Sequence, residues 1–472
     1  MAQTFFFYDL ETSGLSPRDD RIMQFAGLRT DMDLRPIGEP FNLLVRLNDD
    51  TLPSPDAVMV TGITPQSTLG DGLSEAEFAK LLIDEVFQAD TISVGFNNVR
   101  FDDEFIRHLF WRTFRDPYEW CWRDGCSRWD LLDVIRMTRA LRPGGIEWPV
   151  DDEGRPSNRL ELITKANGID HGKAHDALSD VEALIDVARL LKKKQPDLFG
   201  YLLKMRDKKE VKKLVNLDDK RPFVYTSGRY DGRWGKTTVA FPLTAAPNAN
   251  VLVYDLRHDP SVFVKLSEKE LADRLFASWE ERKAEDFVPV PVKTLQYNRC
   301  PAVAPVGVLE GEGWQQVGLD LDAIDAHRKT LLEHPGFAER IRAVMERRPA
   351  FAKSDDAEAQ LYDGFIDGPD KLRIETVRNA DARQLADFHP QFDDDRLSDL
   401  LLRYKARNFP ASMSEDEVMT WEAWRGQRLH RQLPAYLKSL QRLAANADDD
   451  RRFVLEELQL WAEAIMPEPE SD

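Results

Sequence analysis

The sequence predicts an α/β domain, followed by a small β-rich domain and an all-α region. Strand-like and helix-like runs alternate up to about residue 195, which is typical of α/β proteins. Short apolar runs separated by turns continue to about residue 348, and helical patterns dominate from residue 352 onward. We therefore expect three domains, over residues 1–195, 196–348 and 352–472.

The apolar periodicity of the first region predicts its strands and helices. Strands are expected at residues 5–11, 24–31, 41–47 and 91–97. Helices are expected at residues 75–87, 103–114, 131–141, 159–167 and 175–193. Asn158 and Glu161 resemble a capping box before the fourth of these helices, and Gly168 suits its end.

The two later regions differ in their expected secondary structure. Between residues 196 and 348 we expect strands at 221–228, 237–244, 250–257 and 288–297, with a helix at 267–279. After residue 352 we expect only helices, at 357–365, 395–408, 415–430, 433–446 and 451–466.

Length and composition restrict the class of protein. The chain has 472 residues, too many for one core, and 42% of them are hydrophobic. No run approaches 18 apolar residues, and the N-terminus lacks the basic region of a signal peptide, so we expect a cytoplasmic protein without a membrane helix. The three cysteines show no CxxC spacing, which indicates a reducing compartment and no thiolate zinc site.

The charge of the chain is unevenly distributed. The net charge is −19, which as an average argues against nucleic acid. Residues 189–221 nevertheless hold 12 Lys or Arg against 5 Asp or Glu. This basic stretch is either a solvated helix face with a linker or part of a phosphate-binding surface.

Asp9 and Glu11 end the first predicted strand. Side chains at positions i and i+2 of a strand point to the same face, so these two carboxylates should lie side by side. Two close carboxylates repel each other unless a positive charge lies between them. By itself the pair also fits a solvated strand end before the turn at Ser13 and Gly14.

Asp102, His175 and Asp180 occupy comparable positions later in the chain. Asp102 stands where a strand passes into a helix, a position that an N-cap would also fill. His175 precedes Asp180 by five residues, which on a helix places them about 140° apart. Both can face one site only if the helix begins near Asp176.

The four acids together predict a metal site. Four converging carboxylates without a cation would be electrostatically untenable, whereas two divalent ions would make them a two-metal site for phosphoryl transfer. Hard oxygen ligands select Mg²⁺ or Mn²⁺. Each acid alone is a weak signal, but their order in one chain is specific.

These motifs resemble the DEDD exonuclease superfamily, histidine subgroup. Its three motifs read here as YDLETSG, NVRFDDEF and HDALSDVEA. Further segments, TGITPQ, SRWDLLDV, ITKANGI and YKARNFP, extend the resemblance over the whole chain to bacterial exodeoxyribonuclease I. The resemblance implies a ribonuclease H-like exonuclease domain with a mixed sheet, then an SH3-like domain and a helical C-terminal domain.

The resemblance also implies activity and catalytic roles. The expected reaction is processive 3′→5′ hydrolysis of single-stranded DNA to nucleoside 5′-monophosphates, with a role in repair and recombination. Asp9, Glu11 and Asp180 would hold one Mg²⁺ and Asp9 would bridge to a second, with Asp102 acting largely through water. Mn²⁺ should substitute for Mg²⁺. His175 would be the general base.

Aromatic and basic residues between positions 107 and 136 suggest the path of the strand, because single strands bind to cations and stacking rings. The candidate contacts are Thr12 and Glu11 at the terminal nucleotide, and Arg107, Tyr118, Trp122, Arg136 and Arg159 along the strand. For each tryptophan, a place in the core is an equal alternative to a DNA contact, and for each arginine, a solvated position is.

Two other functions fit the same motifs. A 3′→5′ exoribonuclease of the same superfamily would carry the same acids, and a non-catalytic module could cap 3′ ends. The long extensions favour the DNA enzyme, and the intact catalytic positions argue against the binding module. The resemblance further implies a monomer that binds the acidic C-terminal tail of single-stranded DNA-binding protein, in a socket of Arg or Lys and apolar groups.

Overall fold

The computed structural model describes residues 2–172, 176–348 and 353–467, and it forms two compact units. Unit 1 comprises Met1–Ser127, His171–Ile185 and Ala352–Asp472. Unit 2 comprises Arg128–Asp170 and Asp186–Phe351. The units group segments by packing, and the predicted domain boundaries near residues 195 and 350 stay predictions.

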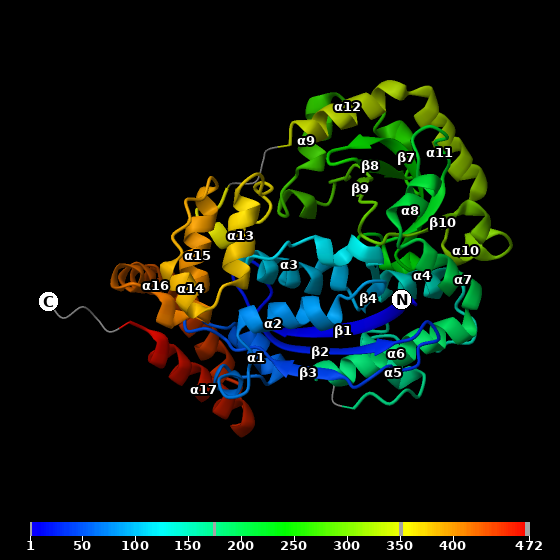
Figure 1. The fold of residues 1–472 in the computed structure, drawn as a ribbon. Helices are drawn as coiled ribbons and strands as arrows, with labels where there is room; N and C mark the ends of the chain where they lie inside the picture. The colour runs from blue at the N-terminus through cyan, green and yellow to red at the C-terminus, as the bar shows by residue number, and fades with distance from the viewer. Residues whose placement is uncertain (1, 173–175, 349–352, 468–472) are drawn as a thin grey trace. The chain divides into compact units, whose positions relative to one another are not determined.

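A mixed sheet lies at the centre of unit 1 (Figure 1). Strand β1 pairs antiparallel with β2 and parallel with β4, and β2 pairs antiparallel with β3. The bounds are β1 Thr4–Thr12, β2 Ile22–Thr30, β3 Phe41–Leu44 and β4 Thr91–Gly95. Residues 5–8 of β1 are at most 1% exposed, as expected for a central strand covered on both faces. The predicted α/β domain with a mixed sheet is confirmed.

Helices pack the aromatic residues of β1 and β2 into one core. Phe6, Tyr8 and Phe25 contact Phe78 of α2 and Phe105 of α3 in a single buried cluster. Helix α2 (Glu75–Leu81) continues into a π-helical turn, Leu82–Val86, and α3 spans Asp102–Arg112. This packing holds the C-terminal end of β1, where Asp9 and Glu11 lie, in a fixed position.

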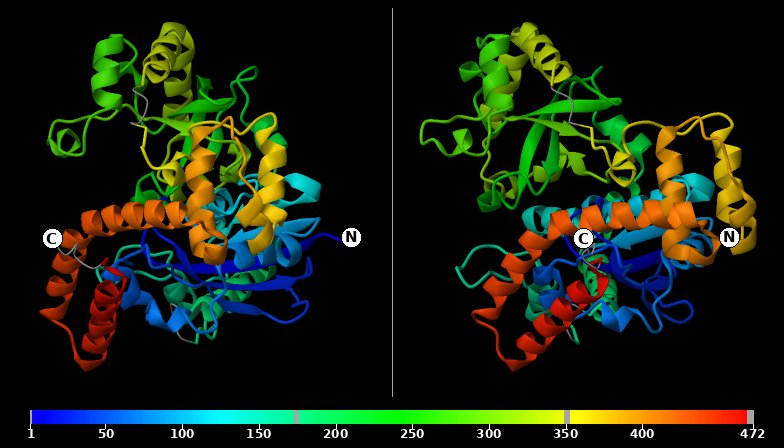
Figure 2. Two further views of the ribbon diagram at one scale, coloured as in Figure 1. Left: turned by 60° about the vertical axis from the view of Figure 1, so that its left-hand side comes forward. Right: turned by 90° about the vertical axis from the view of Figure 1, so that its left-hand side faces the viewer.

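The C-terminal region is helical, as predicted, and it packs within unit 1. Its helices are α13 Asp370–Asn379, α14 Ala382–Asp387, α15 Asp395–Asn408, α16 Glu415–Ala444 and α17 Asp449–Ile465. Leu429 of α16 and Leu458 of α17 share a core with Val58 of α1 (Pro55–Thr61). Figure 2 shows α16 as the long orange helix and α17 in red.

The prediction of two helices at 415–430 and 433–446 is wrong, because α16 runs through Pro434 without a break. A proline inside a helix removes one backbone hydrogen bond, which usually ends or kinks the helix. Here Leu429 before the proline and Tyr436 after it are both buried in the same core. Packing on both sides of Pro434 therefore stabilises the continuous helix.

The predicted helix at 357–365 is also wrong, since only a 3-10 turn at Ala357–Gln360 forms there. Its carbonyl oxygens have other partners. Trp111 Nε1 donates to the carbonyl of Ala357 over 2.9 Å, and Arg396 Nη1 donates to that of Gln360 over 2.7 Å. These tertiary hydrogen bonds replace those that a longer helix would need.

Unit 2 contains an antiparallel sheet in the order β10-β6-β7-β8-β9 (Figure 1). The strands are β6 Phe223–Thr226, β7 Thr237–Ala246, β8 Asn250–Asp255, β9 Val292–Leu295 and β10 Ala302–Pro305. The helices around it are α9 Glu268–Leu275, α10 Gly313–Gln316, α11 Leu321–Glu333 and α12 Pro335–Glu346, of which only α9 was predicted. This sheet confirms the predicted β-rich, SH3-like part of the fold.

Further helices precede this sheet in the chain. They are α4 Leu131–Leu141, α5 Leu160–Ala166, α6 Ala177–Lys194, α7 Pro196–Lys204 and α8 Lys208–Leu214, and β5 spans Ser127–Asp130. The predicted capping box of α5 is wrong: its N-cap is Arg159, with no side-chain cap. Arg139 Nη1 donates to Asn158 Oδ1 over 3.3 Å and to the carbonyl of Ser157, so Asn158 is engaged elsewhere. No helix among the described residues is long and apolar enough to cross a membrane.

Candidate active site

The strand end that carries Asp9 and Glu11 is built as the sequence predicted. Both residues lie on β1, where Asp9 pairs with Ala26 and Glu11 pairs with Gln24 of β2. The register shifts between Glu11 and Thr12, so regular pairing stops directly after the second acid. Alternation along the strand points the two carboxylates to one face.

Asp180 comes to the same place from α6. The helix begins at Ala177, and the Ser179 backbone N–H donates to Asp176 Oδ1 over 3.1 Å at its start. Asp180 therefore lies in the first turn, as the expected helix start near Asp176 requires. Asp9, Glu11 and Asp180 each offer a carboxylate oxygen, and these oxygens all lie within 4.8 Å of one another. We call these three residues the acid cluster.

Asp102 lies outside the acid cluster but shares its electrostatic environment. It is the first residue of α3, it is 4% exposed, and its charge helps to raise the pKa of Glu11. The adjacent Asp103 is engaged in the core, where it accepts hydrogen bonds from the Tyr8 hydroxyl and from Asn98 Nδ2. The structure thus separates the two adjacent acids of the second motif.

The carboxylates of the acid cluster are unfavourable to ionise together. Burial, followed by the charges of Asp180 and Asp102, raises the pKa of Glu11 to about 8. Burial and the charges of Glu11 and Asp180 raise the pKa of Asp9 well above its usual value. A divalent cation would offset this repulsion, and oxygen donors are the ligands that Mg²⁺ and Mn²⁺ prefer. The donor set therefore fits the predicted metal.

Two histidines precede α6, and the structure describes only one of them. His175, the predicted general base, lies outside the described residues. His171 is described, and its Nε2 atom lies 2.6 Å from Asp180 Oδ1. Sequence reasoning missed His171, although the spacing HGKAH places a second histidine four residues before His175.

Besides Glu11, four predicted nucleic-acid contacts lie in unit 1 with the acid cluster. The Arg107 guanidinium lies 5.6 Å from the centre of the Tyr118 ring, and Trp122 is 62% exposed. The Thr12 hydroxyl is buried and donates to the carbonyl of Gly14 over 2.7 Å. Trp122 is thus open to a strand, whereas Arg107 is 7% exposed and its Nη1 atom pairs with Glu104 Oε1 over 3.0 Å. The strand-binding roles of these residues stay predictions.

Two aromatic residues that the sequence analysis missed join Tyr118. The ring of Phe365 lies 6.0 Å and that of Tyr362 lies 6.4 Å from the Tyr118 ring, between centres. Phe365 is 82% exposed. We call Arg107, Tyr118, Tyr362 and Phe365 the aromatic platform. No local pattern predicts this grouping, because Tyr118 and the two later rings are more than 240 positions apart in the chain.

Arg136 and Arg159 belong to unit 2. Arg136 Nη1 pairs with Asp133 Oδ1 over 2.7 Å, and the exposed Arg159 precedes α5. The structure does not place them with the acid cluster, and their strand contacts stay predictions.

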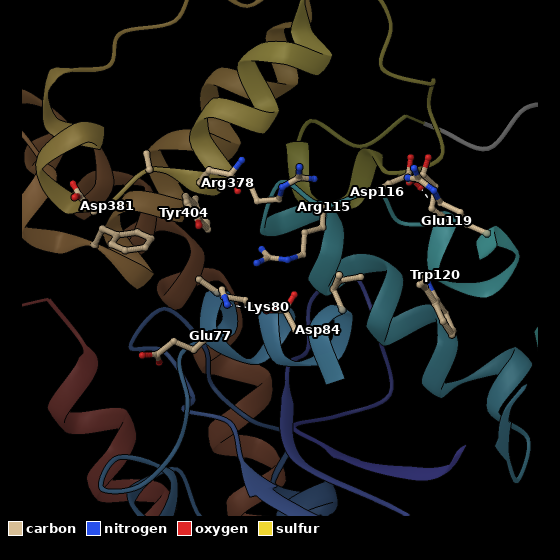
Figure 3. A pocket seen from close by; sticks show the side chains of 16 residues that line it. Glu77, Lys80, Asp84, Arg115, Asp116, Glu119, Trp120, Arg378, Asp381 and Tyr404 are labelled. Carbon is tan, nitrogen blue, oxygen red and sulfur yellow. Dashed lines mark hydrogen bonds and ion pairs between the residues drawn. The ribbon is translucent and has the colours of Figure 1, made fainter. Parts of the chain in front are cut away.

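A pocket of about 620 Å³ elsewhere in unit 1 contains none of the predicted site residues (Figure 3). Its charged side chains are partly paired with one another. Lys80 lies 2.7 Å from Asp84, and Arg123 lies 2.6 Å from Glu119. The acid cluster is therefore distinct from this pocket.

Comparison with known proteins assigns all three parts of the chain. The family models Exonuclease, Exonuclease I SH3-like domain and Exonuclease I C-terminal domain match residues 6–188, 206–347 and 355–465. Exodeoxyribonuclease I of Haemophilus influenzae is 40% identical over 449 residues, which is 95% of each chain. Exodeoxyribonuclease I of Escherichia coli is 40% identical over 468 residues, which is 98% of each chain.

A solved structure supports the same assignment. E. coli exonuclease I in complex with a dA16 oligonucleotide has a TM-score of 0.95 at 39% identity, and the match covers 98% of this chain and 100% of that one. The acids at the end of β1 and the start of α6 thus stand in a fold that aligns along its whole length with a known nuclease. The chain belongs to the exodeoxyribonuclease I family and is a nuclease.

Proposed function

We propose that this protein is a metal-dependent 3′→5′ exodeoxyribonuclease that degrades single-stranded DNA and releases nucleoside 5′-monophosphates. The observation that carries the proposal is the acid cluster, whose ligand oxygens lie within 4.8 Å of one another. The cluster belongs to a chain that is 40% identical to E. coli exodeoxyribonuclease I.

The acid cluster would hold the metal, with Asp102 contributing from α3. We expect two Mg²⁺ ions, with Mn²⁺ as a substitute. When bound, divalent ions stabilise the charge on the attacking and leaving oxygens of phosphoryl transfer. A zinc-bound form of E. coli exonuclease I with single-stranded DNA, 38% identical with a TM-score of 0.94, supports a divalent-ion site in this fold.

The family resemblance assigns the remaining catalytic roles. His175 would accept a proton from the attacking water, a role that suits an imidazole because it can gain or lose a proton near neutral pH. Water oxygen adds to phosphorus, the bond from phosphorus to the 3′ oxygen of the preceding nucleotide breaks, and the terminal nucleotide leaves as a 5′-monophosphate. Thr12 and Glu11 would contact that terminal nucleotide.

Single-stranded DNA is the substrate that the aromatic platform supports best. Every base has a face that can stack on an aromatic ring, and an arginine beside the ring contacts the backbone. Phe365 and Trp122 offer exposed faces, and Tyr118 lies beside Phe365. Arg107 lies over the Tyr118 ring but pairs with Glu104, so it would have to exchange that partner for a phosphate. The E. coli neighbour has been solved with a dA16 oligonucleotide.

Several finer features of the proposal come from the family. We expect processive digestion, a role in DNA repair and recombination, and a monomeric protein in the cytoplasm. All three cysteines are free, in keeping with a reducing compartment. The expected partner is the C-terminal tail of single-stranded DNA-binding protein. A solved structure of SSB and exonuclease I in complex with an inhibitor is 38% identical to this chain, with a TM-score of 0.91.

The test is digestion of single-stranded DNA labelled at its 5′ end, in Mg²⁺, with matched RNA and duplex DNA beside it. Stepwise shortening of the DNA by the wild type, and none by Asp9→Ala, is the expected result. Asp124→Asn is the matched control, because Asp124 is exposed and asparagine tolerates its positive φ of 50°. Shortening of RNA alone would make the protein an exoribonuclease, and binding without shortening would make it a 3′-end-binding module.

A further inference from the structure

We propose that His171 is a positioning residue, which holds the carboxylate of Asp180 in the orientation that a divalent cation requires. The inference rests on the proposed function, because it assigns Asp180 to a metal. It adds a second histidine to the site, with a role different from the proton transfer proposed for His175.

The geometry around Asp180 carries the proposal. Nε2 of His171 lies 2.6 Å from Oδ1 of Asp180, and the two side chains are 7% and 20% exposed. An ionised carboxylate only accepts hydrogen bonds, so Nε2 carries the proton and donates it. A short, largely buried hydrogen bond from a planar ring restricts rotation of the Asp180 carboxylate.

The segment that carries His171 approaches the first turn of α6 closely. A Cβ atom added at Gly172 would lie 3.2 Å from Ser179 Oγ. Asp176 accepts hydrogen bonds from the backbone N–H and the hydroxyl of Ser179, so the entry to α6 is held as well. The backbone next to His171 therefore lies close to the first turn of α6, which carries Asp180.

Such a donor is needed because the acid cluster contains charges of one sign. The charge of Asp180 raises the pKa of both Asp9 and Glu11, so repulsion among the three opposes their convergence. A donor on Oδ1 occupies one oxygen of Asp180 and leaves the other oxygen to a cation. Removing a residue that orients a metal ligand in this way commonly lowers metal affinity or activity by about 10–100-fold.

The test compares Mn²⁺ binding by the full-length wild type and by variants of His171, measured by calorimetry and by electron paramagnetic resonance. His171→Ala removes the ring, His171→Phe keeps its bulk without a donor, and His171→Gln keeps a donor. We expect about 10–100-fold weaker Mn²⁺ binding for the Ala and Phe variants, and near-normal binding for the Gln variant. His430→Ala on the exposed surface of α16 is the matched control.

Digestion of single-stranded DNA at increasing Mn²⁺ provides a second readout. The Ala and Phe variants should need more Mn²⁺ for half-maximal rate and recover most of that rate at saturation. Unchanged or tighter Mn²⁺ binding by a folded His171→Phe or His171→Ala would overturn the inference, as would equally weak binding by His171→Gln. A wild type that binds Mn²⁺ but digests no nucleic acid would overturn the proposed function alone, since the binding comparison still reports on His171.

Discussion

Unit 1 contains one half-buried and one fully buried group of carboxylates, and the two groups have opposite surroundings. In the acid cluster, burial and neighbouring acids raise the pKa values of Asp9 and Glu11. In the second group, burial opposes ionisation of Asp50, yet Arg407, Arg21 and Arg428 lower its pKa to about 2. Ionised carboxylates are thus disfavoured in the acid cluster and favoured in the second group.

The second group, which we call the arginine cluster, joins the strands to the C-terminal helices. Its members are Arg21, Asp50, Glu75, Arg112, Glu358, Arg403, Arg407 and Arg428. Arg21 lies 2.8 Å from Glu358, and Arg407 lies 2.7 Å from Asp50, so acids and bases alternate between distant parts of the chain. Breaking a buried ion pair from one side is costly, whereas half-buried carboxylates with raised pKa values indicate a candidate functional site.

Removing one charge from the acid cluster should have the largest effect on activity. Asp9→Asn deletes a proposed metal ligand, and metal stabilisation of phosphoryl transfer amounts to several kcal/mol, or about 10³-fold in rate. We expect at least that loss in the steady-state rate on single-stranded DNA. The metal-free variant should melt at a higher temperature than the metal-free wild type, because repulsion is relieved. A variant that stays active would contradict the metal role of Asp9.

Removing one charge from the arginine cluster should affect stability instead. Glu358→Gln removes one of the two carboxylates that Arg21 and Arg407 both contact, the other being Asp50. Breaking a buried ion pair from one side typically costs about 3–5 kcal/mol. The midpoint of urea unfolding should fall accordingly. Glu456→Gln, at an exposed position of α17, is the control and should leave the midpoint unchanged. An unchanged midpoint for Glu358→Gln would mean that the cluster does not stabilise unit 1.

The aromatic platform should contribute less than either cluster. Stacking of a base on an aromatic ring is worth about 1–3 kcal/mol. Phe365→Ala should therefore weaken binding of a single-stranded oligonucleotide by about that amount, measured by fluorescence anisotropy. Phe453→Ala removes an equally apolar ring, 62% exposed, from α17 and should change nothing. Equal losses in the two variants would show that Phe365 has no specific contact.

The pH dependence of stability should also distinguish the acid cluster from the arginine cluster. The pKa of Glu11 is about 8 in the fold and 4.5 when unfolded, so in metal-free protein its stabilising protonated form is lost as pH rises across that window. Asp50 behaves oppositely: its contribution is present above 3.8 and is lost as pH falls toward 2. Thermal melts with a chelator should show a lower melting temperature at pH 8 than at pH 5. Glu11→Gln should reduce that difference, and an unchanged difference would rule Glu11 out as its source.

The local sequence determined the elements and the order of the acids. The apolar run before Asp9 predicts β1, and the periodicity of residues 131–141 predicts α4 with its observed bounds. The motif spacing singles out Asp9, Glu11, Asp102 and Asp180, because strand and helix periods decide which side chains share a face. For these features, neighbours along the chain supply the governing interactions.

Only the tertiary structure decided how distant segments combine. Packing on both sides of Pro434 keeps α16 continuous, and hydrogen bonds from Trp111 and Arg396 keep residues beyond 360 out of a helix. The same contacts bring Phe365 to Tyr118, and the approach of Gly172 to α6 brings His171 to Asp180. The physical reason is that burial and long-range hydrogen bonds can outweigh local helix propensity. These interactions join residues far apart in the chain, so a short stretch of sequence does not reveal them.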